Sequence, residues 1–294
     1  MAAGSLYSPV RRSLGGAVEV DLGDDHPGVS DPAYRARRSE LASLSIDWQP
    51  GDPVPQAEYT DVEHEVWRLV SRDLGPLHQR HACRAFLDAK EELGLPEDHV
   101  PQLDEVTERL GPVCGFRYLP VAGLAPLRGF YGAFADSSFF STQYVRHHSV
   151  PLYTPEPDII HEVIGHANQL AHRPFAELYR LVGDAVRRVT TDEALRFLSR
   201  VFWFSFEFGV VWEDGEPRAY GAGILSSSGE CANFAEADLR PLDVAAMGTL
   251  PYDITRYQPV LFAARSTDEV VDAIGAVMAD YDDDTCRRLL QEAS

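Results

Sequence analysis

Helical periodicity from residue 59 onward is the feature that most constrains the fold of this chain. Apolar residues spaced by one and two helical turns line one face of the first predicted helix: Val62, Val66, Leu69 and Val70. The same period, bounded by Gly, Pro and capping residues, predicts further helices near 76–93, 103–110, from 158, 174–189, from 191 and from 266. We therefore expect a mainly α fold with a few short β-strands.

Two regions break this helical pattern. Residues 114–144 are rich in Gly and aromatic side chains and show no sustained period, which predicts loops and short strands. Segments 210–212 and 218–220 flank an Asp214-Gly215 turn, and this arrangement predicts a β-hairpin. The acidic run at 282–284 is expected to be solvated surface.

The predicted domain organisation is simple. Gly and Pro interrupt every apolar cluster in residues 1–31, and residues 32–58 are polar and expected to be extended. Residues 1–58 are therefore interpreted as a flexible or extended N-terminal lead. A single catalytic domain is expected over residues 59–294.

Composition excludes some function classes. The chain has 26 Lys and Arg against 46 Asp and Glu, and the formal net charge of −20 disfavours nucleic-acid binding. No apolar run approaches the ~20 residues of a membrane span, and no secretory signal is visible. The 4 cysteines are widely separated, which indicates reduced thiols and a cytoplasmic protein.

The sharpest local motif is His-Glu-Val-Ile-Gly-His, residues 161–166. It is similar to the zincin HExxH motif, but position i+4 is Gly165, which has no side chain to bind a metal. His166 stands at i+5, about 140° around an ideal α-helix from His161, so the two rings reach one ion only by wrapping toward it. The hexapeptide alone leaves two interpretations open, a metal site or a pair of hydrogen-bonded core histidines.

Glu207 is the candidate third ligand. It lies in the apolar stretch Trp-Phe-Ser-Phe-Glu-Phe, residues 203–208, and a buried carboxylate is costly unless it is paired or bound to a metal. Two histidines and one carboxylate form the facial triad of non-heme Fe(II) oxygenases. Zinc sites use the same atoms, so the ligands alone do not select iron.

Several motifs in order resemble the pterin-dependent aromatic amino acid hydroxylases. The segment from Tyr153 to His166 is similar to the iron-binding signature of that family, and the resemblance extends over about 59–264. Further similar segments are His-Ala-Cys at 81–83, Val-Pro-Gln-Leu at 100–103, Pro-Val-Ala-Gly-Leu at 120–124, Thr-Gln-Tyr at 142–144 and Tyr-Gly-Ala-Gly-Ile-Leu-Ser-Ser at 220–227. The resemblance implies a single catalytic domain of the hydroxylase type.

The resemblance implies roles for individual residues. His161, His166 and Glu207 match the iron ligands, and the catalytic Glu162 matches a residue that lies near the pterin and orders water by the iron. The positions that match pterin-binding residues are Gly123, Leu124, Phe130 and Glu162. Those that match the substrate pocket are Arg146, Thr154, Pro157, Trp203, Phe208, Gly223 and Ser226.

In this interpretation Arg146 binds the substrate carboxylate, Thr154 and Ser226 assist it, and Asp158 could fix its guanidinium. Ala125, Pro126 and Leu127 depart from the Ser-containing pterin loop of animal members. The remaining histidines His147, His148 and His172 match no ligand position and are expected to be surface or structural.

The expected reaction uses Fe(II), a tetrahydropterin such as tetrahydrobiopterin, and O₂. Trp203 argues against tryptophan as the substrate, Ile254 favours phenylalanine over tyrosine, and Phe208 with Gly223 resembles the pocket of para-hydroxylating enzymes. We therefore expect a phenylalanine 4-monooxygenase that makes L-tyrosine from L-phenylalanine, as a monomer or weak oligomer. The alternatives are hydroxylation of tyrosine, of tryptophan or of the phenylalanine meta carbon, a zinc hydrolase with Glu162 as base, and a binding protein without turnover.

Overall fold

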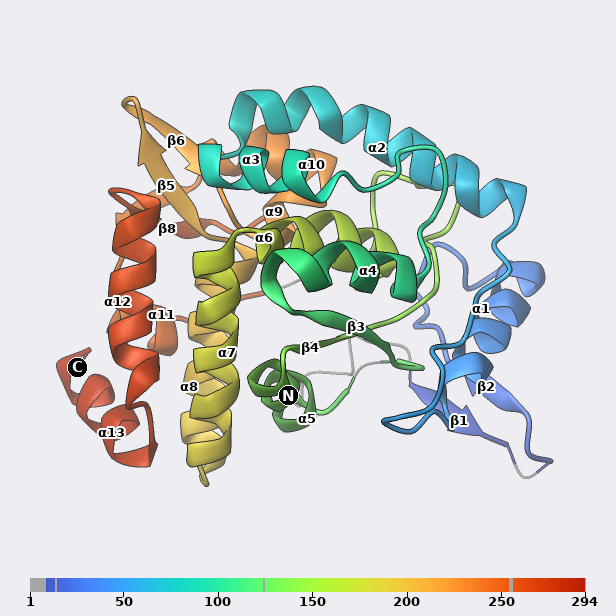
Figure 1. Ribbon diagram of the computed structural model, residues 1–294, viewed down its shortest axis with the longest axis horizontal. Coiled ribbons are helices and arrows are strands. Elements are labelled where there is room, and N and C mark those ends of the chain that lie inside the picture. The colour runs from blue at the N-terminus through green and yellow to red at the C-terminus, as the bar shows by residue number, and fades with distance from the viewer. Residues whose placement is uncertain (1–8, 14, 124, 254–255, 294) are drawn as a thin grey trace.

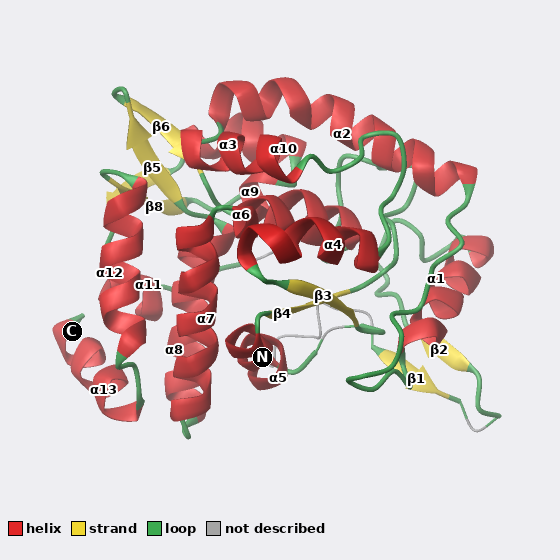
Figure 2. Cartoon of the chain, in the orientation of Figure 1, coloured by secondary structure: helices red, strands yellow, loops and turns green. Residues whose placement is uncertain are grey.

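The computed structural model describes residues 9–13, 15–123, 125–253 and 256–293, and in it the chain is mainly helical, as expected (Figures 1 and 2). The α-helices are α1 Pro32–Ser45, α2 Asp61–His81, α3 Arg84–Leu93, α4 Leu103–Cys114, α5 Leu127–Ala133, α6 Asn168–Ala171, α7 Arg173–Arg188, α8 Asp192–Phe202, α9 Ala222–Leu225, α10 Ser228–Asn233, α11 Val244–Thr249, α12 Thr267–Ala279 and α13 Asp283–Glu292. Two π-helices, η2 His161–Ala167 and η3 Trp203–Glu207, and two 3₁₀ turns, η1 Phe134–Asp136 and η4 Phe234–Glu236, complete the helical elements of the described residues.

The strands are short and form small sheets. They are β1 Val10–Arg12, β2 Val18–Val20, β3 Arg117–Pro120, β4 Ser138–Ser141, β5 Val210–Glu213, β6 Glu216–Ala219, β7 Asp238–Pro241 and β8 Val260–Ala264. The largest sheet has the order β6-β5-β8-β7, and β5 pairs antiparallel with β6. Asp214 and Gly215 both adopt positive φ, 54° and 81°, so the predicted hairpin is confirmed.

Capping residues explain where several predicted helices begin and end. Thr60 and Glu63 form a capping box at the start of α2, and Ser266 caps α12. Gly94 ends α3 in the left-handed conformation, which Gly adopts without strain. The helix α2 continues through Pro76 to His81, so the predicted break at 76 lies instead at Ala82.

Part of the N-terminal lead is helical, which corrects the expectation that residues 32–58 are extended. Asp31 accepts hydrogen bonds from the amides of Ala33 and Tyr34 and so caps α1, and Pro32 occupies the first turn. The inward face of α1 includes Arg38, which forms a buried 2.9 Å ion pair with Glu156. The apolar period is weak here because a charged residue occupies a core position.

The acidic run near the C-terminus is also structured. Asp282 caps α13, a helix that the sequence pattern did not predict. The Asp283 carboxylate accepts hydrogen bonds from the amide and hydroxyl groups of Thr190 and Thr191. This run therefore joins the end of α7 to α13 and is more than solvated surface.

An aromatic core supports the centre of the molecule. Phe134, Phe139 and Phe202 pack with ring centroids 5.6–5.8 Å apart, between α5, β4 and α8. In Figure 1, α7 overlaps α8 to the left of the centre, α2 crosses the top, and α1 with β1 and β2 lies at the edge away from α12 and α13. Within the described residues, every helix is too short or too polar to cross a lipid bilayer.

Candidate active site

Two π-helical turns carry the candidate metal ligands. His161 opens η2 and His166 lies one wide turn later, while Glu207 ends η3, whose amide-to-carbonyl bond from Phe208 to Trp203 spans five residues. A π turn places residues i and i+5 above one another. The 140° separation expected for an ideal α-helix therefore does not occur, because the local helix is wider than an α-helix.

The three predicted ligand side chains meet. The Nε2 atoms of His161 and His166 are 3.2 Å apart, and Glu207 oxygens lie 3.6 Å from His161 Nε2 and 3.1 Å from His166 Nε2. His166 is 1% exposed. Ligand bonds of ~2.0–2.2 Å produce separations of this size around one transition-metal ion.

Hydrogen bonds behind His166 fix its tautomer. The Gln169 amide nitrogen donates to the carbonyls of Phe206 and Tyr220, so its Oε1 must accept. Tyr179 Oη donates to that Oε1 and therefore accepts from His166 Nδ1–H at 2.7 Å. His166 Nε2 consequently carries its lone pair toward His161 and Glu207, where a metal ion would bind.

A hydrogen bond to Nδ1 also orients His161 for metal binding. Its Nδ1 lies 2.8 Å from Ser226 Oγ, and an Nδ1–H that donates there leaves Nε2 free to ligate. Burial lowers the pKa of His161 to about 4, so the imidazole is neutral at neutral pH. Ser226, which the resemblance assigned to substrate, therefore also contacts a metal ligand.

Two carboxylates flank the histidines, and their surroundings shift their pKa values in opposite directions. Glu162 also has a ligand atom within 4.8 Å of those of His161 and His166. Burial, with Glu207 and Asp158 nearby, raises the pKa of Glu162 well above its usual range and so favours its neutral form. The neighbouring His166 and His161 outweigh burial and lower the pKa of Glu207. Because a ligating carboxylate must be ionised, Glu207 is the better ligand.

These donors fit a divalent metal ion. Without a cation, two ring lone pairs and a carboxylate would converge on one point, an arrangement that a metal compensates. Close packing explains why position i+4 of the motif is Gly165, which has no ligand side chain. A Cβ there would lie 2.8 Å from the Ala222 carbonyl oxygen, so η2 packs directly against α9.

A cavity of about 510 Å³ opens beside the metal ligands. Its lining includes every predicted substrate-pocket residue, together with His161 and Glu207: Arg146, Thr154, Pro157, Trp203, Phe208, Gly223 and Ser226. Trp203 and Phe208 lie with ring centroids 4.6 Å apart. A Cβ at Gly223 would lie 2.9 Å from Phe208 Cε2, so the absence of a side chain allows this ring position.

The Arg146 guanidinium is held rigidly, as expected, by Asp158. Nε and Nη2 of Arg146 donate to the two carboxylate oxygens at 3.0 and 2.8 Å. Asp158 also accepts from the backbone amides of Arg146 and His161, at 2.8 and 3.1 Å. The same carboxylate therefore orients the cationic group and the first residue of the metal motif.

A second, narrower cleft shares Glu156 and Pro157 with the larger cavity. It holds about 40 Å³ and is lined by Gly123, Phe130 and Glu162 among the predicted pterin residues. Leu124, like Ile254 of the substrate argument, lies outside the described residues. Glu162 Oε2 is buried without a hydrogen-bond partner among the described residues, which suits a polar ligand, although the cleft must widen to admit a bicyclic ring.

Sequence reasoning missed several residues at these sites. Arg38 of α1 lines the narrow cleft and lies 3.4 Å from the Tyr144 ring centroid. Tyr252 stacks on Trp203 with centroids 4.2 Å apart, and Glu230 lines the larger cavity. Tyr179 and Gln169 orient His166 from 13 and 3 residues away, positions that no ligand motif contains. The apolar face of α7 signalled only that Tyr179 is buried.

The fold and the site together bring two histidines and one carboxylate, the donor set of a 2-His-1-carboxylate metal centre, beside an amino-acid-sized cavity. The chain matches the biopterin-dependent aromatic amino acid hydroxylase family over residues 14–283 and belongs to it. The match begins before residue 59, where the resemblance in the sequence starts. This membership makes iron and a biopterin the cofactors of the site and does not support the hydrolase alternative.

Two relatives are named as phenylalanine hydroxylases, and their names differ in the ring position that is hydroxylated. The chain is 50% identical over 265 residues to phenylalanine 3-hydroxylase of Streptomyces coeruleorubidus, covering 90% of this chain and 95% of that protein. It is 40% identical to bovine phenylalanine-4-hydroxylase over 87% of this chain, and it spans 58% of the length of that relative.

A solved structure shares the fold. Chromobacterium violaceum phenylalanine hydroxylase, with bound iron(III) and 7,8-dihydrobiopterin, aligns with a TM-score of 0.75 and 28% identity. The alignment covers 83% of this chain and 89% of that one.

Proposed function

We propose that this chain hydroxylates L-phenylalanine at the para carbon to give L-tyrosine, with Fe(II), a tetrahydropterin and O₂. The observation that carries the proposal is the cavity lined by Arg146, which Asp158 holds from behind, by the Trp203–Phe208 ring pair and by two candidate metal ligands. A substrate whose carboxylate binds Arg146 would place its ring against these aromatic side chains, near the metal ligands.

In this proposal the residues have separate roles. When bound, the iron and the reduced pterin supply the electrons and the O₂ chemistry. His161, His166 and Glu207 would hold the metal ion, while Gly123, Leu124, Phe130 and Glu162 would hold the pterin. Glu162 borders both the narrow cleft and the metal cluster, and burial raises its pKa there. The apolar neighbours of Glu207 exclude water from the reacting groups.

The para position rests on Phe208 and Gly223. The Phe208 ring fills the space next to Gly223, so it limits how the substrate ring can move sideways in the cavity. Meta hydroxylation is the second candidate, because the 50% identical Streptomyces relative carries the name phenylalanine 3-hydroxylase.

Product analysis tests the proposal. The iron-loaded protein is given tetrahydrobiopterin, O₂ and, in separate reactions, L-phenylalanine, L-tyrosine and L-tryptophan. We expect para-tyrosine from phenylalanine as the main product. Mainly meta-tyrosine would establish the second candidate, and turnover of tryptophan or tyrosine alone would refute phenylalanine as the substrate.

We further propose a cytoplasmic monomer or weak oligomer. All four cysteines are free, and burial raises the pKa values of Cys83 and Cys231 to about 12, so these thiols are unreactive. Light scattering coupled to gel filtration measures the oligomeric state, and a stable tetramer would contradict this part of the proposal.

A further inference from the structure

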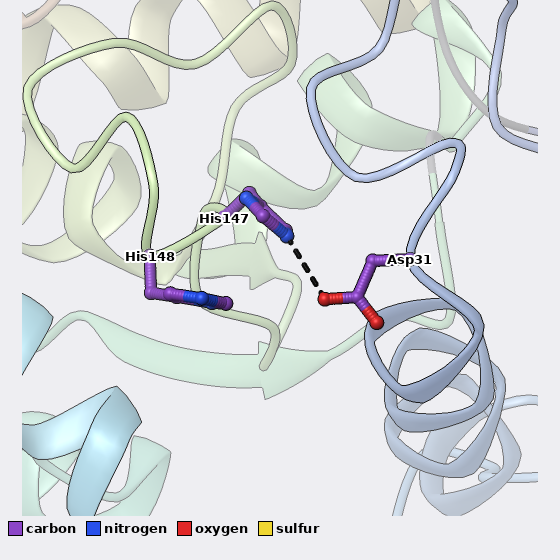
Figure 3. Close-up of side chains that lie close together, drawn as sticks. All are labelled: Asp31, His147 and His148. Carbon is purple, nitrogen blue, oxygen red and sulfur yellow. Dashed lines mark hydrogen bonds and ion pairs between the residues drawn. The ribbon is translucent and has the colours of Figure 1, made fainter.

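A second group of two histidines and a carboxylate lies outside the active site. Asp31, His147 and His148 each have one ligand atom within 4.8 Å of the others. Figure 3 shows Asp31 at the start of α1 and both histidines on one loop, with His147 turned toward the carboxylate. Neither histidine was expected to bind a metal from the sequence, and His147 is buried, at 7% exposure.

Two of the three donor groups of this cluster contact each other in the structure. Asp31 uses Oδ1 to cap α1, and its Oδ2 lies 3.3 Å from His147 Nε2. His147 Nδ1 accepts from the Ser149 amide at 3.3 Å and lies 2.7 Å from Ser149 Oγ, so Nε2 carries the proton that faces Asp31, and a metal ion at Nε2 would displace that proton. His148 is exposed and makes no hydrogen bond with the described residues, and its ring centroid lies 4.4 Å from that of His147.

We propose that Asp31, His147 and His148 form a second metal site, for a divalent transition-metal ion such as Zn²⁺. Two imidazoles and one carboxylate, with water in the remaining position, are a donor set that zinc binds readily. The ion differs from the catalytic one in its surroundings, because it is open to solvent at His148 and joins two separate segments of the chain.

The site has a structural consequence for the substrate pocket. His147 directly follows Arg146, whose side chain is committed to Asp158, and Tyr34 of α1 donates a hydrogen bond to the Val145 carbonyl at 3.1 Å. A bound ion would therefore pin the start of α1 to the loop that carries Arg146. We expect it to stabilise this attachment and to protect residues near 31 from proteolysis.

Zinc titration of the iron-loaded protein tests the site. Zinc binding is followed by competition with a chromophoric chelator, and iron and zinc are both counted by mass spectrometry after gel filtration. The wild-type protein should retain its iron and bind one zinc ion in addition. Asp31→Asn and His148→Ala should each weaken zinc binding at least tenfold.

These two variants are chosen to leave the fold intact. Asn caps helices as well as Asp does, and His148 is exposed. His172→Gln, at a histidine outside both clusters, is the matched control and should bind zinc like the wild type. Zinc should also raise the thermal midpoint of the wild type and slow trypsin cleavage in α1, with no such effect in Asp31→Asn.

Three results would overturn the proposal. The iron-loaded wild type could bind no second ion, zinc could bind only as iron is lost, or both variants could bind zinc with unchanged affinity. The first two would leave the catalytic cluster as the sole zinc site of the protein, and the third would move the second ion to other residues.

Discussion

Two clusters of two histidines and one carboxylate differ in how their donors are held. We call them the catalytic cluster (His161, His166 and Glu207) and the surface cluster (Asp31, His147 and His148). His161 and His166 stand one π turn apart on a single helix, and each Nδ1 has a protein partner that directs Nε2 inward. In the surface cluster the histidines are neighbours on a loop, and one of them is exposed. Prior orientation and burial, more than donor type, therefore separate a catalytic centre from a surface ion site.

Removal of one carboxylate at a time should affect the two clusters most strongly. Glu207→Ala should abolish stoichiometric iron binding and lower hydroxylation by at least ~10³-fold, because two histidines on an otherwise apolar wall bind iron weakly. Asp31→Asn should keep the iron content and the turnover number of the wild type. Metal analysis and single-turnover assays measure both, and iron loss in Asp31→Asn would show that the clusters are coupled.

The orienting hydroxyls provide the next test. Tyr179→Phe removes the acceptor of His166 Nδ1–H and should lower Fe(II) affinity by ~10–100-fold. Ser149→Ala, which removes the equivalent partner of His147, should leave Fe(II) affinity unchanged and weaken only zinc binding. Chelator competition measures both affinities, with circular dichroism as the check on folding. Equal iron affinity in Tyr179→Phe and the wild type would refute the tautomer argument.

The packing of η2 on α9 is tested by glycine substitution. Gly165→Ala places a Cβ 2.8 Å from a backbone oxygen and should destabilise the protein by ~1–3 kcal/mol. Gly75→Ala in α2 meets no atom within 4 Å and should stabilise by ~0.5–1 kcal/mol. Urea unfolding of both variants gives the two values. A neutral Gly165→Ala would mean that η2 can move away from α9.

Glu230 should make substrate binding depend on pH. Burial raises its pKa to about 7, so the carboxylate gains charge in the substrate cavity between pH 6 and 8. That charge attracts the substrate ammonium group, and KM for phenylalanine should fall a few-fold as the pH rises through this range. Glu230→Gln should flatten the KM profile while kcat changes little.

The same group affects stability with a definite sign. Because the folded pKa lies above the usual 4.5, protonated Glu230 favours the folded state at low pH, and this contribution is lost as the pH rises through about 7. Glu230→Gln should therefore be more stable than the wild type above pH 7 but not below pH 5. Parallel stability curves for the two proteins would contradict this assignment.

The candidate metal ligands could be proposed from the residues themselves. A glutamate among phenylalanines and a doubled histidine motif are visible without coordinates, and so are helix limits marked by Gly94 or Ser266. The candidate pocket residues came from the resemblance to the family, and the structure places them around one cavity.

What the sequence could not supply was the local helix type and the distant partners. The π turn at 161–167 packs closely on α9, and neither the turn nor this contact is visible in the residue pattern, so an ideal α-helix gave the wrong angle between the two histidines. Tyr179 contacts His166 from another helix. The inward face of α1 carries the charged Arg38, which is paired with Glu156, so this helix lacks a clear apolar period. Such tertiary partners leave no local periodic trace.

The wide turn of η2 also determines how an insertion or a deletion would change the spacing of the two histidine ligands. Loss of the single codon for Val163 would leave His-Glu-Ile-Gly-His, in which an ordinary α-helix sets both imidazoles on one face in the HExxH spacing. The two ligand spacings therefore differ by one residue, and the wider π turn accommodates that residue. Substitutions inside the hexapeptide can be tolerated one side chain at a time, but any change of its length resets the register of every residue that follows, from His166 to Tyr179.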